Sequence, residues 1–201
     1  MNYLAHLYLA GTDTGKIVGN FIADAVKGDD YLNFAPHIRS GIIMHRRIDS
    51  FTDNHPVVRE SIRRLRPKHH KFSGIIVDMF YDHFLAANWS DYSSEDLLAF
   101  TNHRFAILID HFHLMPHRTQ RMLPHMIRNN WLMAYASLDG LDQALTGISQ
   151  RTTFVSRMED AVEDLKANYS GFEKEFREFF PDIQKFVSEN GFDSFQERIV
   201  T

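Results

Sequence analysis

Apolar residues recur every three or four positions along almost the whole chain, and this spacing restricts the fold more than any other feature. In residues 14–28, for example, Ile17, Val18, Phe21 and Ile22 fall on one face of a helix. No segment alternates apolar and polar residues over the length of a strand, and no internal repeat occurs. The sequence therefore predicts an all-α helical bundle, formed by residues 1–201 as a single domain.

Capping residues, glycines and prolines set the expected ends of the helices. Pro67 is expected to end one helix, and Pro181 to kink or split the last one. Residues 72–89 are apolar around the whole helix, which indicates a buried central helix. The expected helices span 14–28, 37–53, 56–66, 72–89, 93–114, 117–138, 141–147, 153–168 and 172–190.

Composition excludes several classes of site. The chain has no cysteine, so disulfides, thiolate zinc sites and cysteine nucleophiles are impossible. A metal site would have to use Asp, Glu and the 12 histidines. The net charge of −4 argues against a general nucleic-acid coat, and no apolar run approaches the roughly 20 residues of a membrane span. The N-terminal segment lacks the basic region of a signal peptide, so we expect a cytoplasmic protein without a membrane partner.

The expected central helix carries three polar residues that do not suit an apolar environment. Asp78 and Asp82 are four residues apart and share a face, while His83 points about 100° away from Asp82. Burying an ionised carboxylate costs several kcal/mol unless it is paired or bound to a metal. These acids therefore either form buried salt bridges with arginines or belong to a metal site.

Three other segments also direct an acid or an imidazole toward the expected core. His45 and Asp49 are four residues apart on the inward face of residues 37–53. Asp24 flanks the apolar face of residues 14–28, and His6 lies in the nonpolar segment NYLAHLYLA, where a hydrogen-bonded core histidine is the alternative. Like-charged carboxylates repel unless a cation gathers them. A site of oxygen and imidazole ligands suits Mn²⁺, Mg²⁺ or Fe²⁺ at least as well as Zn²⁺, and such ions support phosphoester hydrolysis.

Two clusters of basic residues provide candidate binding groups. Arg46 and Arg47 follow His45 and could grip a phosphate group. The run RESIRRLRPKHHK at residues 59–71 includes Arg63 and Arg64 and contains one acid, so we expect either a solvated face or a docking site for an acidic protein. Without interleaved aromatic residues, it does not favour nucleic acid. A further group is expected at the surface and comprises His103, Asp110, His111, His113, His117 and His125.

Several of these segments, in this order, resemble the acyl carrier protein phosphodiesterase family. The matching blocks are NYLAHLYLA, GNFIADAVKG, GIIMHRRIDSFTDNHP, GIIVDMFYDHFLAANW and GFEKEFREFFPDI, which together cover nearly the whole chain. The resemblance implies Mn²⁺-dependent hydrolysis of the phosphodiester that links 4′-phosphopantetheine to a serine of holo acyl carrier protein, a small acidic protein. It also implies a distant relation to the all-helical HD-type metal phosphohydrolases. The chain has no His–Asp dipeptide, and the order is reversed at Asp82–His83.

The resulting hypothesis is a helical metallohydrolase. We expect His6, Asp24, His45, Asp82 and His83 to bind metal, with Asp24, Asp78, Asp82 and His83 taking part in catalysis and Arg46, Arg47, Arg63 and Arg64 binding the substrate. Asp78 or Asp49 would orient the ligands. The alternatives are an HD-type nucleotide phosphohydrolase and a non-catalytic helical binding protein whose buried acids are paired with arginines.

Overall fold

Helices form the regular secondary structure of the protein, as seen in a computed structural model that describes residues 1–191. No strand occurs within that range, so the expected all-α fold is confirmed. The α-helices are α1 (Tyr3–Leu9), α2 (Thr14–Ile22), α3 (Pro36–Asn54), α4 (Pro56–His69), α5 (Ser73–Ala87), α6 (Leu97–Asp110), α7 (His117–Arg128), α8 (Trp131–Ala134), α9 (Leu138–Gln150), α10 (Ala161–Ala167) and α11 (Tyr169–Asn190). Short 3₁₀ turns join several of them, among them η1 (Ala23–Ala25), η2 (Gly28–Asn33) and η5 (Phe112–Leu114).

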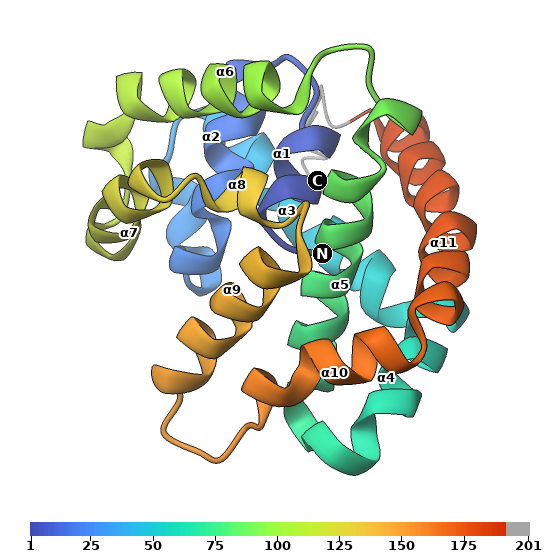
Figure 1. The fold of residues 1–201 in the computed structure, drawn as a ribbon. Helices are drawn as coiled ribbons and strands as arrows, with labels where there is room; N and C mark the ends of the chain where they lie inside the picture. The colour runs from blue at the N-terminus through green and yellow to red at the C-terminus, as the bar shows by residue number, and fades with distance from the viewer. Residues whose placement is uncertain (192–201) are drawn as a thin grey trace.

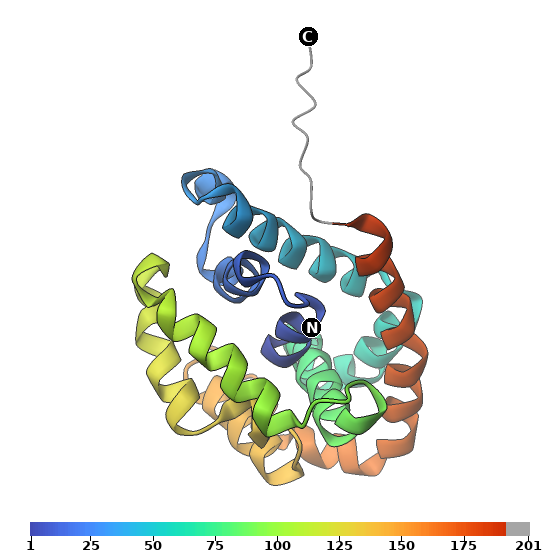
Figure 2. The same ribbon diagram turned by 90° about the horizontal axis from the view of Figure 1, so that it is seen from above.

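Helix α5 runs through the middle of the molecule with α1 packed beside it (Figure 1). Helix α11 lies on one side, and α7 lies on the opposite side (Figures 1 and 2). Nearly every side chain of α5 from Ile76 to Ala86 is buried, as expected for a helix that is apolar all round. The first turns of the chain therefore lie deep in the bundle, and residues on α1 can reach its interior.

Helices α2 and α3 cross at very short range because glycines face each other at the contact. A Cβ atom added to Gly19 would lie 2.0 Å from the carbonyl oxygen of Ile38, and one added to Gly41 would lie 2.6 Å from that of Lys16. Real Cβ atoms do not approach backbone this closely, so the crossing requires glycine at both positions. This crossing brings the end of α2 and the turn η1 against the inward face of α3.

Several helix ends differ from the expected ones, for local physical reasons. The side chain of Asp96 accepts hydrogen bonds from the N–H groups of Leu98 and Ala99, so α6 begins there and not at residue 93. The expected helix 117–138 is interrupted at Asn130, whose φ of 40° is left-handed. The expected helix over 153–168 begins only at the turn before α10.

Two prolines do not end their helices. Helix α4 continues through Pro67, and α11 continues through Pro181. An interior proline removes one backbone hydrogen bond. Phe179, Phe180 and Ile183 on either side of Pro181 are fully buried, and their packing outweighs that loss.

Candidate metal centre

Two histidines and an aspartate from separate helices converge in the interior. The ligand atoms of His6 on α1 and of His45 and Asp49 on α3 all lie within 4.8 Å of one another. The Asp49 carboxylate lies between the rings, with Oδ1 3.0 Å from His6 Nε2 and Oδ2 3.1 Å from His45 Nε2. Asp24 on η1 joins from the other side, since its Oδ1 is 3.1 Å from the same His45 nitrogen. We call these four residues the His–Asp cluster.

Helix geometry explains how the cluster assembles. His45 and Asp49 are one turn apart on α3, so their side chains project from the same face. The α1 helix places the His6 ring against that of His45, with centroids 3.9 Å apart and planes 20° from parallel. Both imidazoles are buried, whereas the carboxylates of Asp24 and Asp49 retain 65% and 39% of their exposure. The cluster is therefore closed on its histidine side and open on its carboxylate side.

Asn20 holds the two histidines in place, although the sequence analysis did not single it out. Its Oδ1 is 3.0 Å from His45 Nδ1, and its Nδ2 donates to the His6 carbonyl at 3.1 Å. With its Nδ1–H donated to Asn20, His45 directs Nε2 toward both carboxylates, which is how metal-binding histidines are commonly oriented. The sequence offered one signal for this role, which is a polar amide among the apolar residues of α2. In the structure the Asn20 side chain is 1% exposed.

The pKa values of the two histidines are shifted in opposite directions. Burial lowers the pKa of His45, but its hydrogen bonds to Asp24 and Asp49 outweigh burial and raise the pKa to about 9. Burial and the charge on His45 lower the pKa of His6 to about 4. Hydrogen bonds from His45 and His6 hold the pKa of Asp49 far below its usual range despite burial. Near neutral pH the ligand-free cluster therefore holds one proton on His45 between two carboxylates.

The donor set fits a divalent cation. Two imidazole nitrogens and two carboxylates converge without a thiolate, a combination that binds Mn²⁺, Fe²⁺ or Zn²⁺. The Nε2 atoms of His6 and His45 both face the Asp49 carboxylate, so one ion could contact all three side chains. A divalent ion would take the place of the shared proton and neutralise the facing carboxylates.

The structure separates Asp82 from this cluster, contrary to the expected metal-binding and catalytic role. Its carboxylate is fully buried and accepts the backbone N–H groups of Leu4 at 2.7 Å, Ala5 at 3.2 Å and Asn2 at 3.3 Å. Asp82 thus caps the N-terminus of α1, which has no capping side chain of its own. Burial raises the pKa of Asp82 to about 7, against the opposing effect of these hydrogen bonds. Its role is to position α1, and through it His6.

His83 is likewise taken up by protein partners. Its Nδ1 donates to the Tyr135 carbonyl at 2.8 Å, and its Nε2 accepts from the Tyr169 hydroxyl at 2.9 Å. Burial lowers its pKa, so the ring is neutral and neither nitrogen is available to a metal. The structure thus places His83 outside the His–Asp cluster and does not support the expected metal-binding and catalytic roles.

Asp78 lies beside the cluster without joining it. Its Oδ1 accepts a hydrogen bond from the amino group of Met1 at 2.8 Å, and the same nitrogen lies 3.9 Å from Asp49. The positively charged amino group of Met1 thus lies between Asp78 and Asp49, and Asp78 does not contact the cluster directly. Within residues 1–191, neither Asp78 nor Asp82 pairs with an arginine, which the non-catalytic alternative required.

Arg46, Arg63 and Arg64, which were expected to bind substrate, contact other groups of the protein. Arg46 donates to the carbonyls of Val26 and Gly28 and thereby holds the loop after η1. On α4, Arg63 pairs with Glu60 and Arg64 with Glu175, so part of the charge of the basic run is neutralised. Helix α4 also lies far from α7 (Figures 1 and 2). Arg47 is exposed on α3, and its substrate-binding role stays a prediction.

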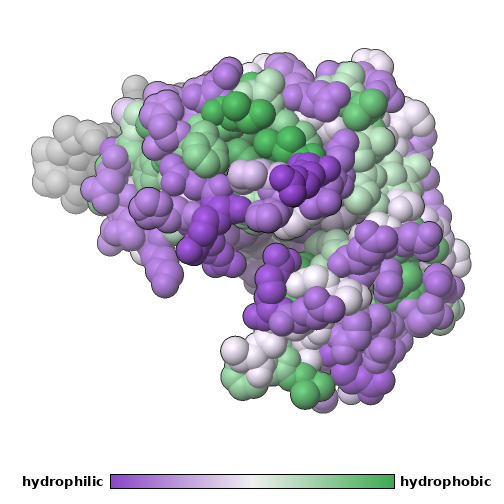
Figure 3. Space-filling view, turned by 60° about the vertical axis from the view of Figure 1, so that its left-hand side comes forward, coloured by the Kyte–Doolittle hydropathy of each residue, from purple (hydrophilic) through white to green (hydrophobic). Residues whose placement is uncertain are grey.

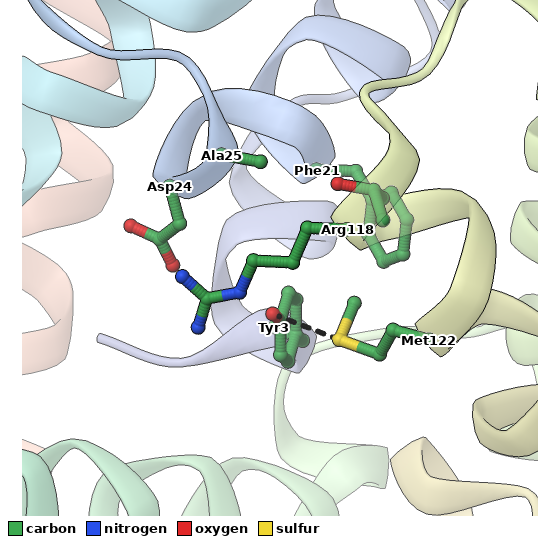
Figure 4. Close-up of a pocket in the computed structure, with 7 residues that line it drawn as sticks. Tyr3, Phe21, Asp24, Ala25, Arg118 and Met122 are labelled. Carbon is green, nitrogen blue, oxygen red and sulfur yellow. Dashed lines mark hydrogen bonds between the residues drawn. The ribbon is translucent and has the colours of Figure 1, made fainter.

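A pocket of about 240 Å³ opens beside Asp24. Figure 4 shows the Arg118 side chain of α7 extending toward the Asp24 carboxylate, with the Tyr3 and Phe21 rings nearby. The remaining lining residues are Ala25, Thr119 and Met122. The left-hand side of the molecule in Figure 1, where α7 lies, is visibly hollowed and rimmed largely by hydrophilic residues (Figure 3). The pocket thus joins the open side of the His–Asp cluster to solvent, and Arg118 places a cation in it.

The remaining expectations concern the surface. His103, His113, His117 and His125 are exposed. In residues 1–191, His6, His45 and Asp49 form the one group of three or more ligand-type side chains close enough to share a metal ion. No helix in that part of the chain is long and apolar enough to cross a membrane.

Comparisons with known proteins agree with the resemblance noted from the sequence. The profile of a family described as "Acyl carrier protein phosphodiesterase" matches residues 1–183. Curated proteins of that name are similar over most of their length. The protein from Serratia proteamaculans is 33% identical over 92% of this chain and 96% of its own. Those from Photorhabdus laumondii and Salmonella agona are 32% and 34% identical over 90% of this chain, covering 92% and 94% of their own. No solved structure matches the chain, so the HD-type architecture stays a prediction.

Proposed function

The chain belongs to the acyl carrier protein phosphodiesterase family, and we propose on that premise that it hydrolyses the phosphodiester between 4′-phosphopantetheine and a serine of holo acyl carrier protein. The observation that supports this most directly is the convergence of His6, His45, Asp49 and Asp24 at the edge of a pocket. Water adds to phosphorus, the bond from phosphorus to the serine oxygen breaks, and the serine oxygen takes up a proton. The products are 4′-phosphopantetheine and the apo carrier protein.

The His–Asp cluster would hold a divalent cation, with Mn²⁺ as the candidate. His6 and His45 supply nitrogen, Asp49 supplies oxygen between them, and the more exposed Asp24 completes the set toward the pocket. An ion bound there supplies Lewis-acid activation of water and of a phosphoryl oxygen.

The chain's own residues account for orientation and charge. Asn20 keeps Nε2 of His45 facing the carboxylates, and Asp82 holds α1 so that His6 meets them. Asp24 is the most exposed carboxylate of the cluster and lines the pocket, so it can accept a hydrogen bond from the attacking water. Arg118 lies across the pocket, where its guanidinium can bind the phosphodiester oxygens and stabilise the charge that develops on them.

The mass of the carrier protein provides the test. Holo carrier protein incubated with the enzyme and Mn²⁺ should lose the mass of 4′-phosphopantetheine, and a chelator should prevent the loss. His45→Gln should lower kcat/KM at least about 100-fold, since it removes a central ligand. The matched control His103→Gln, at an exposed position of α6, should retain activity.

An unchanged carrier mass with folded enzyme and Mn²⁺ would refute the proposal. Parallel reactions with free nucleotides separate it from the nucleotide phosphohydrolase alternative, which requires turnover of nucleotides and an intact carrier protein.

A further inference from the structure

Helix α7 has an unusual charge distribution. Its twelve residues, His117–Arg128, include three arginines and two histidines but no acid. Thr119, Leu123 and Met126 are buried against the bundle, whereas Arg118, Arg121, His125 and Arg128 are exposed. All the charge of this helix therefore faces solvent and has one sign.

The arginines follow one line along the helix. At 3.6 residues per turn, Arg118, Arg121 and Arg128 fall within an arc of about 80°, and their Cα atoms span about 15 Å along the axis. We call these three residues the α7 arginine stripe. His125 falls inside the same arc.

Arg118 extends toward the Asp24 carboxylate across the pocket, whereas Arg121 and Arg128 lie outside the pocket lining (Figure 4). None of the three guanidinium groups of the stripe forms a hydrogen bond or ion pair within residues 1–191. The run on α4 differs, since Arg63, Arg64 and Lys68 pair with Glu60, Glu175 and Asp164 respectively. An uncompensated cationic surface attracts anionic partners more strongly than a run of paired charges does.

The stripe begins at the proposed active site. Arg118 lines the pocket with Asp24, and Asp24 contacts His45 of the His–Asp cluster (Figure 4). From there the stripe follows α7 along the outer edge of the molecule (Figure 1). A macromolecule whose modified side chain enters this pocket must rest its surface on α7.

Exposed apolar residues adjoin the first turn of α7. Phe112 and Leu114 of η5 are 37% and 39% exposed. Gln120 Nε2 donates to the Phe112 carbonyl at 3.0 Å and ties η5 to α7. Apolar contacts beside arginines are typical of protein interfaces, and the exposed aliphatic side chain of Leu114 has no counterpart in phosphate or base contacts.

We propose that the α7 arginine stripe, with Phe112 and Leu114, is the docking surface for an acidic face of the carrier protein next to its modified serine. This inference rests on the proposed function and names the surface that selects the substrate. Complementary charge speeds the encounter and fixes the orientation in which the serine reaches the pocket. The sequence left the basic run of α4 open as a docking site or a solvated face, and the ion pairs of Arg63, Arg64 and Lys68 make it the weaker candidate.

Binding of fluorescently labelled apo carrier protein, measured by anisotropy at about 0.1 M salt, tests the surface independently of catalysis. Arg121→Glu with Arg128→Glu should weaken binding at least about tenfold and reduce its salt dependence. The matched control is Lys174→Glu with Lys185→Glu on α11, which changes the net charge equally on the opposite side (Figure 1). We expect the control to bind within about twofold of the wild type. The double variant Arg121→Gln with Arg128→Gln removes the charge without reversing it, and it should show an intermediate loss of carrier-protein binding. It therefore tests the surface even if the double charge reversal misfolds.

Unchanged carrier binding by both α7 variants would overturn the inference, as would an equal loss in the α11 control. The same variants should also be tested for binding to DNA and to anionic vesicles. If the α7 variants lose binding to either of these but still bind the carrier protein, the stripe serves another partner and the inference is overturned. A wild type that binds the carrier through the stripe but releases no 4′-phosphopantetheine would refute the proposed function and leave the docking surface standing.

Discussion

Asp49→Asn tests whether the His–Asp cluster binds metal, because it changes charge with almost no change in shape. Asp49 contacts both imidazole rings, with its carboxylate oxygens 3.0 Å and 3.1 Å from their Nε2 atoms. Its carboxylate is 39% exposed. Without metal, the substitution removes one of two anionic partners of His45, and after allowance for solvent screening it should cost about 1 kcal/mol of unfolding free energy.

The effect on metal binding should be larger. Loss of an anionic ligand should weaken Mn²⁺ binding about 100-fold. At an Mn²⁺ concentration 100 times the wild-type Kd, bound metal stabilises the wild type by about 2.7 kcal/mol but the variant by only about 0.4 kcal/mol. For a chain of this length the corresponding rise in Tm is about 5–10 °C for the wild type and about 1–2 °C for Asp49→Asn.

Thermal unfolding with and without Mn²⁺, followed by circular dichroism, measures this difference directly. Asp53→Asn is the matched control, since Asp53 is exposed one turn further along α3, and its Tm should rise as much as that of the wild type. A full Mn²⁺-dependent rise in Asp49→Asn would show that the ion binds elsewhere. No rise in the wild type would show that the cluster is a hydrogen-bonded network only.

Other predictions concern pH, orientation, capping and packing. Because metal must displace the proton of His45, whose pKa is about 9, the Kd for Mn²⁺ in calorimetry should fall about tenfold per pH unit from 6.5 to 9 and level off above. In the metal-free protein, the stabilisation from that raised pKa is complete below pH 6.5 and is lost as the pH rises through 9, which denaturant titrations will show. Asn20→Ala should weaken Mn²⁺ binding about 10- to 100-fold in the same calorimetry, whereas intact affinity would remove its orienting role. Asp82→Asn should lower the unfolding free energy by about 1–2 kcal/mol but change Mn²⁺ affinity less than about tenfold; a loss of 100-fold or more would restore Asp82 as a ligand. Gly19→Ala should destabilise the fold by about 3 kcal/mol or more in urea unfolding, whereas Gly74→Ala, where an added Cβ meets nothing within 4 Å, should be neutral or stabilising by up to about 1 kcal/mol.

Local periodicity predicted much of the fold and part of the site. The three- and four-residue spacing identified the α3 and α5 helices, and the i,i+4 pair of His45 and Asp49 does face inward. Spacing within one helix fixes which side chains share a face, so this part of the cluster could be predicted.

Partners distant in the sequence could not be predicted. Burial of Asp82 was evident from its apolar neighbours, but its hydrogen bonds go to backbone groups 77 to 80 residues away. A buried carboxylate is satisfied equally well by amides or by a metal, and the chain pattern does not distinguish them. The basic run of α4 shows the same limit, because Glu175, which neutralises Arg64, is 111 residues away.

Diffraction from crystals soaked in Mn²⁺, with anomalous data collected at the manganese edge, tests the central claim most directly. The account predicts one strong peak bounded by His6 Nε2, His45 Nε2 and the carboxylates of Asp24 and Asp49. A peak at Asp82 or His83 instead, or none at the His–Asp cluster at saturating Mn²⁺, would contradict it.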